Sequence, residues 1–256
     1  MIPGFRRRIR QHEILLGPVI QTPSPQIVEI AALAGFDFVM IDTEHGEFTL
    51  ESVPELIRAA DARGVASVVK VRSIDESLIC KALDFGANAV SIPGISTASE
   101  AELVAAAARY VPRGKRSGAP TIRAAAYSSE PWPEYLRRVN EEVSVWVKVE
   151  GEQALENIGE IIAAGDPDVI SIGLFDLSQS LGVPGELNHP KVIEAVKKIS
   201  NRVGTDGPAM GTFARKADQV NSCVSLGLTV FNYTLDQEML LQAFRDAIRA
   251  VKAKAK

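Results

Sequence analysis

Residues 66–93, ASVVKVRSIDESLICKALDFGANAVSIP, contain the pattern that decides the fold. Two short and almost continuous apolar runs, 66–71 and 88–93, flank an amphipathic stretch at 76–85. Apolar runs without polar alternation are typical of parallel strands covered on both faces, whereas the stretch between them has the spacing of a helix. Gly86 is suited to end that helix, because glycine accepts the positive φ found there. The segment therefore predicts a strand–helix–strand unit.

The same unit repeats along the chain of 256 residues. Strands are predicted at residues 15–20, 36–41, 66–71, 88–93, 144–149, 168–172, 209–212 and 229–232. Helices are predicted at residues 25–33, 50–62, 76–85, 99–110, 153–164, 190–202, 217–226 and 236–251. Eight alternating units of this total length favour a single (β/α)8 barrel domain over residues 1–256. An open doubly wound sheet is the alternative, but its first strand is usually followed by a glycine-rich turn, and here that turn reads QTPSP.

Composition and charge argue against two classes of partner. The net charge of −4 provides no overall field that would attract nucleic acid. The basic segment RRRIR at 6–10 is either an arm for nucleic acid or membrane, or a solvated first helical turn, which is the interpretation we favour. No run reaches the length of about 18 apolar residues needed to span a membrane. Cys80 and Cys223 lie far apart in helix-like stretches, which indicates reduced thiols and a cytoplasmic protein.

Two carboxylates are expected at the end of the barrel that carries the chemistry in this fold, where the strands have their C-terminal ends. Glu150 follows the strand at 144–149, and Asp176 follows the strand at 168–172. Close carboxylates repel unless one is protonated or a cation lies between them, and oxygen ligands suit Mg²⁺ or Mn²⁺. The pair therefore predicts a divalent-metal site. Either residue could instead cap a helix or pair with a cation such as Lys148.

Other polar residues belong to the same end of the barrel. His45 lies in the acidic loop DTEHGE at 42–47, where a histidine can act as a general base. Lys70 and Arg72 are expected on one face of their strand. They could hold a carboxylate, stabilise an enolate oxygen, or neutralise the acidic pair with no metal present. Lys70 and Lys148 also leave a Schiff-base mechanism open.

The longest irregular stretch is 112–133, which is rich in Gly, Ser, Arg and Pro. A loop of this length in a compact barrel is usually a functional lid or an interface element. We therefore expect one of these two roles for it.

Taken together, these positions resemble the HpcH/HpaI family of metal-dependent class II pyruvate aldolases over nearly the whole chain. The resemblance rests on the order and spacing of several short segments rather than on one motif. These are AGFDF at 34–38, IDTEH at 41–45, LDFGA at 83–87, YVPRGKR at 110–116, GLFDLS at 173–178, LG at 181–182 and HP at 189–190.

The resemblance implies a carbon–carbon lyase that joins or separates a 2-oxo acid, pyruvate or a close analogue, and an aldehyde. Glu150 and Asp176 would hold the metal, Mg²⁺, Mn²⁺ or Co²⁺, which stabilises the pyruvate enolate as a Lewis acid. His45, paired with Asp84, would move protons to and from the aldol hydroxyl. Lys70 or Arg72 would supply the cation that anchors the substrate.

The resemblance also implies substrate contacts and an assembly. Backbone N–H groups near Gly173, Phe175 and Asp176 would receive the carboxylate of the acid. Independently of the resemblance, Thr212 ends the strand at 209–212 and is therefore expected to contact the substrate. Family members form trimers or hexamers in which the C-terminal helix exchanges between subunits. Residues 240–251 are apolar enough to dock on a neighbour.

Three departures from the family pattern leave room for other functions. Lys70 replaces the usual arginine, and residues 125–127 replace further arginines. The family pattern GPxDLS reads GLFDLS at 173–178, so Leu174 replaces the proline and Phe175 stands beside Asp176. A carbon–carbon lyase for acyl-CoA esters, of the citrate lyase β-subunit type, is one alternative. The phosphates of coenzyme A would need a basic rim around the site, for which the candidates are Arg113, Lys115, Arg116 and Arg123. A catalytically silent binding barrel is the other alternative.

Overall fold

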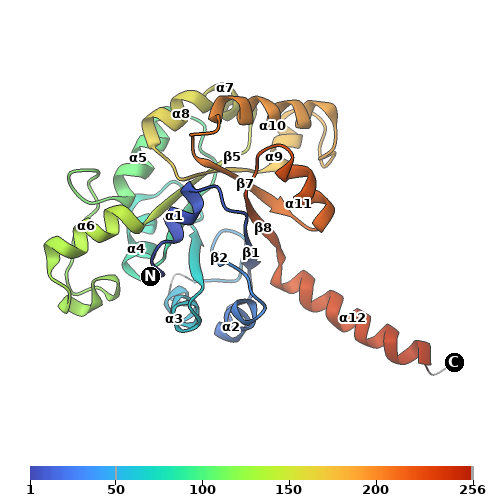
Figure 1. Cartoon of the computed structure of the whole chain (residues 1–256), viewed down its shortest axis with the longest axis horizontal. Coiled ribbons are helices and arrows are strands. Elements are labelled where there is room, and N and C mark those ends of the chain that lie inside the picture. Colours follow the sequence, from blue (N-terminus) through green and yellow to red (C-terminus); the bar gives the residue numbers. More distant parts are fainter. Residues whose placement is uncertain (50, 255–256) are drawn as a thin grey trace.

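The computed structural model describes residues 1–49 and 51–254 and contains one closed barrel of eight parallel strands with helices around it (Figure 1). The strands are β1 (Leu15–Ile20), β2 (Phe38–Asp42), β3 (Ala66–Lys70), β4 (Ala89–Ile92), β5 (Ser144–Val149), β6 (Val169–Ile172), β7 (Ala209–Ala214) and β8 (Val230–Leu235). Each strand pairs with the next along the chain, and β1 pairs with β8 to close the ring. The predicted (β/α)8 barrel is confirmed.

The helices follow the predicted alternation with several differences. They are α1 (Phe5–Arg10), α2 (Pro25–Leu33), α3 (Val53–Arg63), α4 (Glu76–Asp84), α5 (Ala98–Ala108), η1 (Arg123–Ser128), α6 (Trp132–Glu142), α7 (Glu152–Glu156), α8 (Ile158–Gly165), α9 (Leu174–Ser180), α10 (Pro190–Val203), α11 (Ala217–Val224) and α12 (Asp236–Lys254). The single helix predicted at 153–164 is wrong, because the chain breaks it into α7 and α8 at Asn157. The predicted helix start at Leu50 lies outside the described residues.

Side chains from the strands form two apolar layers. The inner layer fills the barrel and contains Phe38, Val68 and Trp146, whereas the larger outer layer lies between the strands and the helices. Phe5 of α1 closes the N-terminal end of the barrel, with its ring 6.0 Å from that of Phe38 and 6.4 Å from that of Trp146. The opposite end, where the strands have their C-terminal ends, is therefore the mouth of the barrel.

The basic segment at the N-terminus is part of this closure, and its predicted description as a solvated turn is wrong for Arg6. The Arg6 side chain is buried, and its Nε donates to Asp168 at 2.8 Å. Its Nη1 donates to the carbonyl oxygens of Asn140 and Glu141. Arg10 also donates to Asp168, so these arginines fasten α1 to the barrel rather than facing a partner.

The irregular segment 112–133 does not cover the mouth of its own barrel. It follows α5, and helices in this fold run back from the mouth toward the N-terminal ends of the strands. Arg123 in η1 donates to Asp61 and to the carbonyl oxygen of Phe85, which is the residue after α4 ends. A lid over its own active site is therefore excluded, and an interface role stays a prediction.

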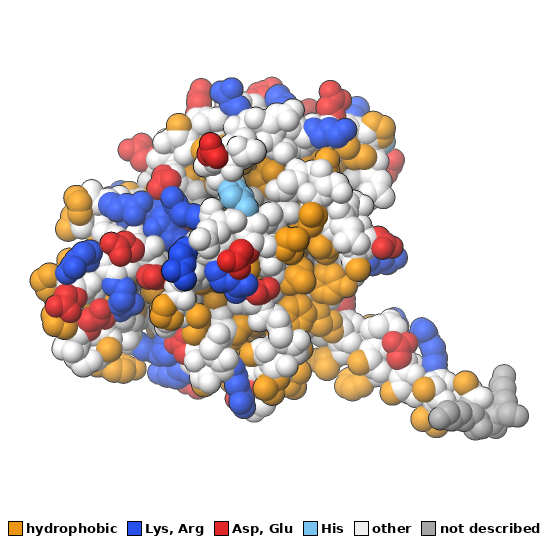
Figure 2. Space-filling model, viewed as in Figure 1, with side chains coloured by type: hydrophobic (Ala, Val, Ile, Leu, Met, Phe, Trp, Pro, Cys, Tyr) orange, Lys and Arg blue, Asp and Glu red, His pale blue; other side chains and the backbone are white. Residues whose placement is uncertain are grey.

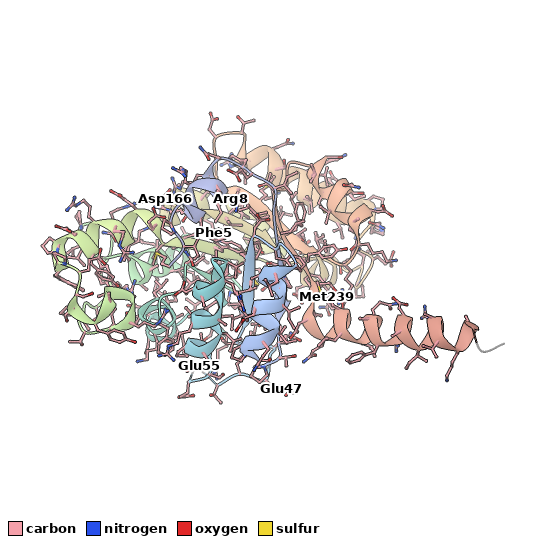
Figure 3. The ribbon with its side chains drawn as sticks, turned by 60° about the horizontal axis from the view of Figure 1, so that its bottom comes forward. Phe5, Arg8, Glu47, Glu55, Asp166 and Met239 are labelled. Carbon is pink, nitrogen blue, oxygen red and sulfur yellow. The ribbon has the colours of Figure 1, made fainter. Side chains whose placement is uncertain are left out.

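The last helix leaves the barrel. Helix α12 contacts β1 and β8 only near its root and then extends away from the rest of the molecule (Figure 1). Figure 3 labels Met239 near that root, with Phe5 and Asp166 at one end of the barrel and Glu47 and Glu55 at the other. Among the described residues, no helix combines the length and the apolar character that a bilayer crossing requires.

Candidate active site

Strand alternation decides which side chains enter the mouth. Met40, Val68 and Trp146 belong to the inner layer, so the residues two positions further along β2, β3 and β5 face the same interior nearer the mouth. These residues are Asp42, Lys70 and Lys148. Asp42 and Lys70 lie opposite each other in the register of β2 and β3, and both side chains are buried.

Asp42 organises the loop that presents His45. One carboxylate oxygen accepts from the backbone N–H groups of Glu44 and His45, both at 3.1 Å. The other oxygen accepts from the Gln21 amide at 3.1 Å. Because three donors hold this buried carboxylate, the loop after β2 has a fixed conformation at its first turn.

Within this loop, the Glu44 carboxylate lies between the Lys70 ammonium and the His45 imidazole. The Lys70 ammonium lies 2.5 Å from Glu44 Oε2 and 3.6 Å from Asp42 Oδ1. The same Glu44 oxygen lies 3.4 Å from His45 Nε2, and the imidazole itself is 63% exposed. The carboxylate next to His45 in this chain is therefore Glu44, for which the sequence predicts no role.

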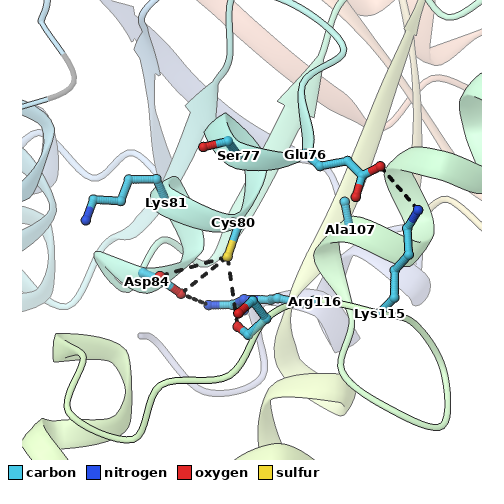
Figure 4. A pocket seen from close by; sticks show the side chains of 9 residues that line it. Glu76, Ser77, Cys80, Lys81, Asp84, Ala107, Lys115 and Arg116 are labelled. Carbon is cyan, nitrogen blue, oxygen red and sulfur yellow. Dashed lines mark hydrogen bonds and ion pairs between the residues drawn. The ribbon is translucent and has the colours of Figure 1, made fainter.

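The predicted pairing of His45 with Asp84 is not formed within this chain. Asp84 is the last residue of α4, which runs away from the mouth, and its carboxylate accepts from Arg116 Nη2 at 2.7 Å. Figure 4 shows this pair beside Cys80 in a cavity of about 380 Å³ between α4, α5 and the start of segment 112–133. Asp84 therefore belongs to a different face of the barrel from His45.

A second charge cluster lies at the ends of β5 and β6. The Lys148 ammonium contacts Glu150 Oε1 directly and lies 3.6 Å from Asp176 Oδ2. The other oxygen of Glu150 accepts from the Gly94 N–H at 3.1 Å. Burial alone would lower the pKa of Lys148, but the carboxylates, Glu150 first, raise that pKa above its ordinary value. The structure thus brings the two predicted metal ligands together around one cation.

The donor chemistry of the mouth suits a divalent cation. Four carboxylates, of Asp42, Glu44, Glu150 and Asp176, face two ammonium groups, which leaves two uncompensated negative charges. Within residues 1–49 and 51–254, no cluster of three or more His, Cys, Asp or Glu side chains is arranged to hold a metal. Two protein carboxylates with the remaining positions filled by water and substrate oxygens is a common arrangement for Mg²⁺ and similar ions.

Gly173 and Phe175 both lie beside this cluster, but Gly173 does not offer its N–H to a substrate. That N–H donates to the Val149 carbonyl at 3.0 Å as part of the β5–β6 pairing, which corrects the sequence expectation. What matters at Gly173 is the missing side chain, since a Cβ there would lie 2.8 Å from Glu150 Cγ and 3.1 Å from Lys148 Cε. The Phe175 ring is exposed in the first turn of α9, next to Asp176.

Replacement of Gly173 by alanine is expected to lower kcat/KM for aldol cleavage by roughly 10- to 100-fold, because displacing Glu150 and Lys148 by a few tenths of an ångström misaligns the site. Gly151→Ala is the matched control, since a Cβ there would meet only Ser180 Oγ, at 3.5 Å. Steady-state kinetics on both variants provide the measurement. Equal rates for the two would show that the packing at Gly173 has no part in catalysis.

Thr212 does not face the mouth, and its predicted substrate contact is corrected. It lies on the same face of β7 as Met210 and Ala214, which belong to the outer layer, and it is fully buried. Its hydroxyl donates to the Ile172 carbonyl at 2.9 Å. The residue of β7 that packs against the inner layer near the mouth is Phe213, which no sequence pattern singles out.

Thr212→Val is accordingly expected to leave kcat/KM within about twofold of the parent, because it removes only a structural hydrogen bond, while lowering the free energy of unfolding by about 1 kcal/mol. Denaturant unfolding and initial rates measure the two quantities. A loss of activity greater than about tenfold in a folded protein would return Thr212 to the substrate site.

Arg72 lies two residues beyond the end of β3 and is exposed. It is not part of the buried cluster formed by Lys70, Asp42 and Glu44. Its predicted role in anchoring a substrate stays a prediction. Of the two cations that the sequence proposed at this strand, the structure brings Lys70 into the mouth.

Comparison with known proteins identifies the family of this barrel. A family model described as HpcH/HpaI aldolase/citrate lyase matches residues 20–243. A 2-keto-3-deoxy-L-rhamnonate aldolase from Shigella sonnei (strain Ss046) is 31% identical over 250 residues, which cover 97% of this chain and 93% of that protein.

Solved structures agree with this result. An HpcH/HpaI aldolase/citrate lyase family protein from Burkholderia cenocepacia J2315 superposes with a TM-score of 0.91 at 30% identity, covering 97% of this chain and 99% of that one. The citrate synthase SbnG gives a TM-score of 0.87 at 27% identity, with 98% of each chain covered. The chain therefore belongs to the HpcH/HpaI aldolase/citrate lyase family and is, as the sequence predicted, a carbon–carbon lyase of the class II aldolase type.

Proposed function

We propose that this enzyme cleaves and forms the bond between a 2-oxo acid, pyruvate or a close analogue, and an aldehyde, with Mg²⁺, Mn²⁺ or Co²⁺ held by Glu150 and Asp176. The observation that carries the proposal is the charge balance of the mouth. Glu150 and Asp176 share the Lys148 ammonium, and the four carboxylates there carry two more charges than the two ammonium groups balance. When bound there, a divalent cation supplies Lewis-acid stabilisation of an enolate.

The residues of this chain would bind the acid and move one proton. The first N–H groups of α9, at Leu174, Phe175 and Asp176, have no helical carbonyl partner and would receive the substrate carboxylate. In cleavage, His45 would take the proton of the aldol hydroxyl while the bond to the neighbouring methylene carbon breaks. The products are an aldehyde and an enolate, and protonation of the enolate carbon gives the methyl group of pyruvate.

The relatives support a sugar-acid substrate. The protein from Shigella sonnei is named for a 2-keto-3-deoxy acid, which has a methylene group between its keto carbon and a hydroxyl-bearing carbon. We infer a substrate of this class for the present enzyme. The exposed Phe175 ring beside Asp176 would contact the aldehyde portion and restrict its size and polarity.

Exchange of the pyruvate methyl protons in D₂O, followed by NMR, tests the first part of this function without knowledge of the aldehyde. Exchange is expected with Mg²⁺, Mn²⁺ or Co²⁺ and is expected to stop with EDTA. Glu150→Gln should exchange no faster than buffer containing the same metal. Absence of exchange with every metal would contradict the proposed enolate chemistry.

The acyl-CoA alternative receives little support from the charges of the chain. The four cations proposed as a basic rim are each paired with a carboxylate of their own chain rather than gathered at the mouth. The pairs are Arg113 with Asp166, Lys115 with Glu76, Arg116 with Asp84, and Arg123 with Asp61. The silent-barrel alternative is set aside, because the relatives are aldolases.

We also propose that the enzyme is a homo-oligomer, a trimer or hexamer, in which α12 docks on a neighbouring subunit. Phe244, Ile248 and Val251 recur at helical spacing on α12, and all three are more than half exposed. Figure 2 shows hydrophobic side chains along α12 and on the barrel surface beside its root. Because α12 leaves its own barrel, apolar surface is exposed both on α12 and on the barrel beside its root. Exchange of α12 between copies would bury both surfaces.

Phe244→Asp combined with Ile248→Asp is expected to convert the assembly to a smaller species, because two charges would enter an apolar interface. Gln242→Asp combined with Arg249→Asp, on the opposite face of α12, is the matched control and should leave the mass unchanged. Light scattering after size-exclusion chromatography gives the masses. A monomeric parent protein, or an unchanged mass in the first variant, would refute the docking.

A further inference from the structure

The mouth contains two lysines, the buried Lys70 and the partly buried Lys148, and each pairs with different carboxylates. Lys70 pairs with Glu44 and Asp42, next to His45. Lys148 pairs with Glu150 and Asp176, the two carboxylates assigned to the metal. The Lys148 side chain is only 19% exposed, so most of its surroundings are protein rather than bulk water.

We propose that Lys148 is an internal counter-cation that competes with the divalent cation for Glu150 and Asp176 and thereby sets how weakly the enzyme holds its metal. This proposal rests on the metal site of the proposed function. It adds a residue that controls affinity without being a ligand, because an ammonium group has no lone pair to offer a metal.

The packing of the site supports direct competition rather than a distant influence. Lys148 and Glu150 point to the same side because they are two residues apart at the end of β5. The Gly173 backbone packs closely against both side chains, since a Cβ on this residue would lie 3.1 Å from Lys148 Cε and 3.1 Å from Glu150 Oε1. A cation that enters between the carboxylates must therefore displace the ammonium or lie beside it, and both outcomes oppose binding.

The role also explains how the two carboxylates can lie close together before a metal arrives. Without a cation between them, two neighbouring negative carboxylates would repel each other. The Lys148 ammonium holds one Glu150 oxygen, and the Gly94 N–H holds the other. The site is therefore kept in one arrangement, at the cost of a lower metal affinity.

The test is a titration of EDTA-stripped, full-length protein with Mn²⁺, in which free Mn²⁺ is measured by its electron paramagnetic resonance signal. Lys148→Gln is expected to bind Mn²⁺ at least about 10-fold more tightly than the parent, equivalent to about 1.4 kcal/mol. Lys70→Gln is the matched control, because it removes the same charge from the other carboxylate pair. Its affinity should stay within about threefold of the parent.

Each outcome decides the proposal. Equal or weaker Mn²⁺ binding by Lys148→Gln, or an equal gain in Lys70→Gln, overturns the competition while leaving the proposed metal site intact. Absence of Mn²⁺ binding in the parent and both variants overturns the metal site and this role together. Lys148→Met provides a second neutral variant if the glutamine variant does not give a folded circular dichroism spectrum.

A Schiff base on Lys148 is the competing interpretation, and the same samples exclude or establish it. An amine that forms an imine with pyruvate releases water, and borohydride then reduces the imine to a stable secondary amine on the protein. Mass spectrometry after borohydride treatment with pyruvate is expected to show no adduct on Lys148. An adduct there would overturn its role as a permanent counter-cation.

Discussion

Glu150→Gln is expected to abolish metal retention through dialysis and to lower kcat/KM for aldol cleavage by about 10³-fold or more. The amide would remove one of the two proposed anionic ligands. Loss of the cation would then remove several kcal/mol of enolate stabilisation, with each 1.36 kcal/mol worth a factor of ten. The barrel should remain folded, because Glu150 lies outside both apolar layers. Metal analysis after dialysis, release of pyruvate and the far-ultraviolet circular dichroism spectrum measure the three effects.

The chain offers a matched control two residues away. Glu152 is an exposed carboxylate in the first turn of α7, so Glu152→Gln makes the same chemical change outside the mouth. It should keep both metal and activity. Asp176→Asn is expected to behave like Glu150→Gln, since both carboxylates lie next to the Lys148 ammonium in this structure. If Glu150→Gln retains metal and full turnover, the site lies elsewhere in the barrel.

Much of the barrel could be predicted from the sequence because buried parallel strands leave a strong signal. The runs at 15–20 and 144–149 are strands with those bounds, since apolar character on both faces marks each strand along its whole length. Helix α6 was missed for a local reason. Pro133 resembles the end of the irregular stretch in the sequence, yet proline is also favoured in the first turn of a helix, and it lies there in α6.

The candidate site was predictable where it depends on the period of a strand and unpredictable where it depends on packing. Lys148 lies near the end of β5 and Glu150 directly follows that strand, so their spacing of two residues places both on one face. The inward or outward phase of β7 gave no signal, because AMG at 209–211 is apolar on both faces, and so Thr212 was assigned to the wrong side. The position of Asp84 depends on a helix direction relative to a distant loop, which spacing along the chain does not encode.

The network around His45 has a consequence for the proposed proton transfer. Asp42 fixes the backbone of the loop, whereas Glu44 lies between the Lys70 ammonium and the imidazole. A carboxylate in that place orients the ring for proton transfer. Lys70 stands where relatives are expected to carry arginine. It would then act on the reaction through Glu44, whereas an arginine could bind the substrate carboxylate with two parallel hydrogen bonds.

His45→Ala is expected to lower kcat for aldol cleavage by about 10²- to 10⁴-fold, the range usual for loss of a positioned general base. Its Mn²⁺ affinity should stay within about threefold of the parent, because the imidazole has its described ion-pair contact with Glu44 rather than with Glu150 or Asp176. His12→Asn, at the opposite end of the barrel, is the matched control and keeps a residue type that tolerates the positive φ of 54° found there. Single-turnover cleavage at saturating metal gives the rate of the chemical step. An unchanged rate would remove His45 from the mechanism, whereas loss of rate together with loss of metal would make it a ligand instead of a base.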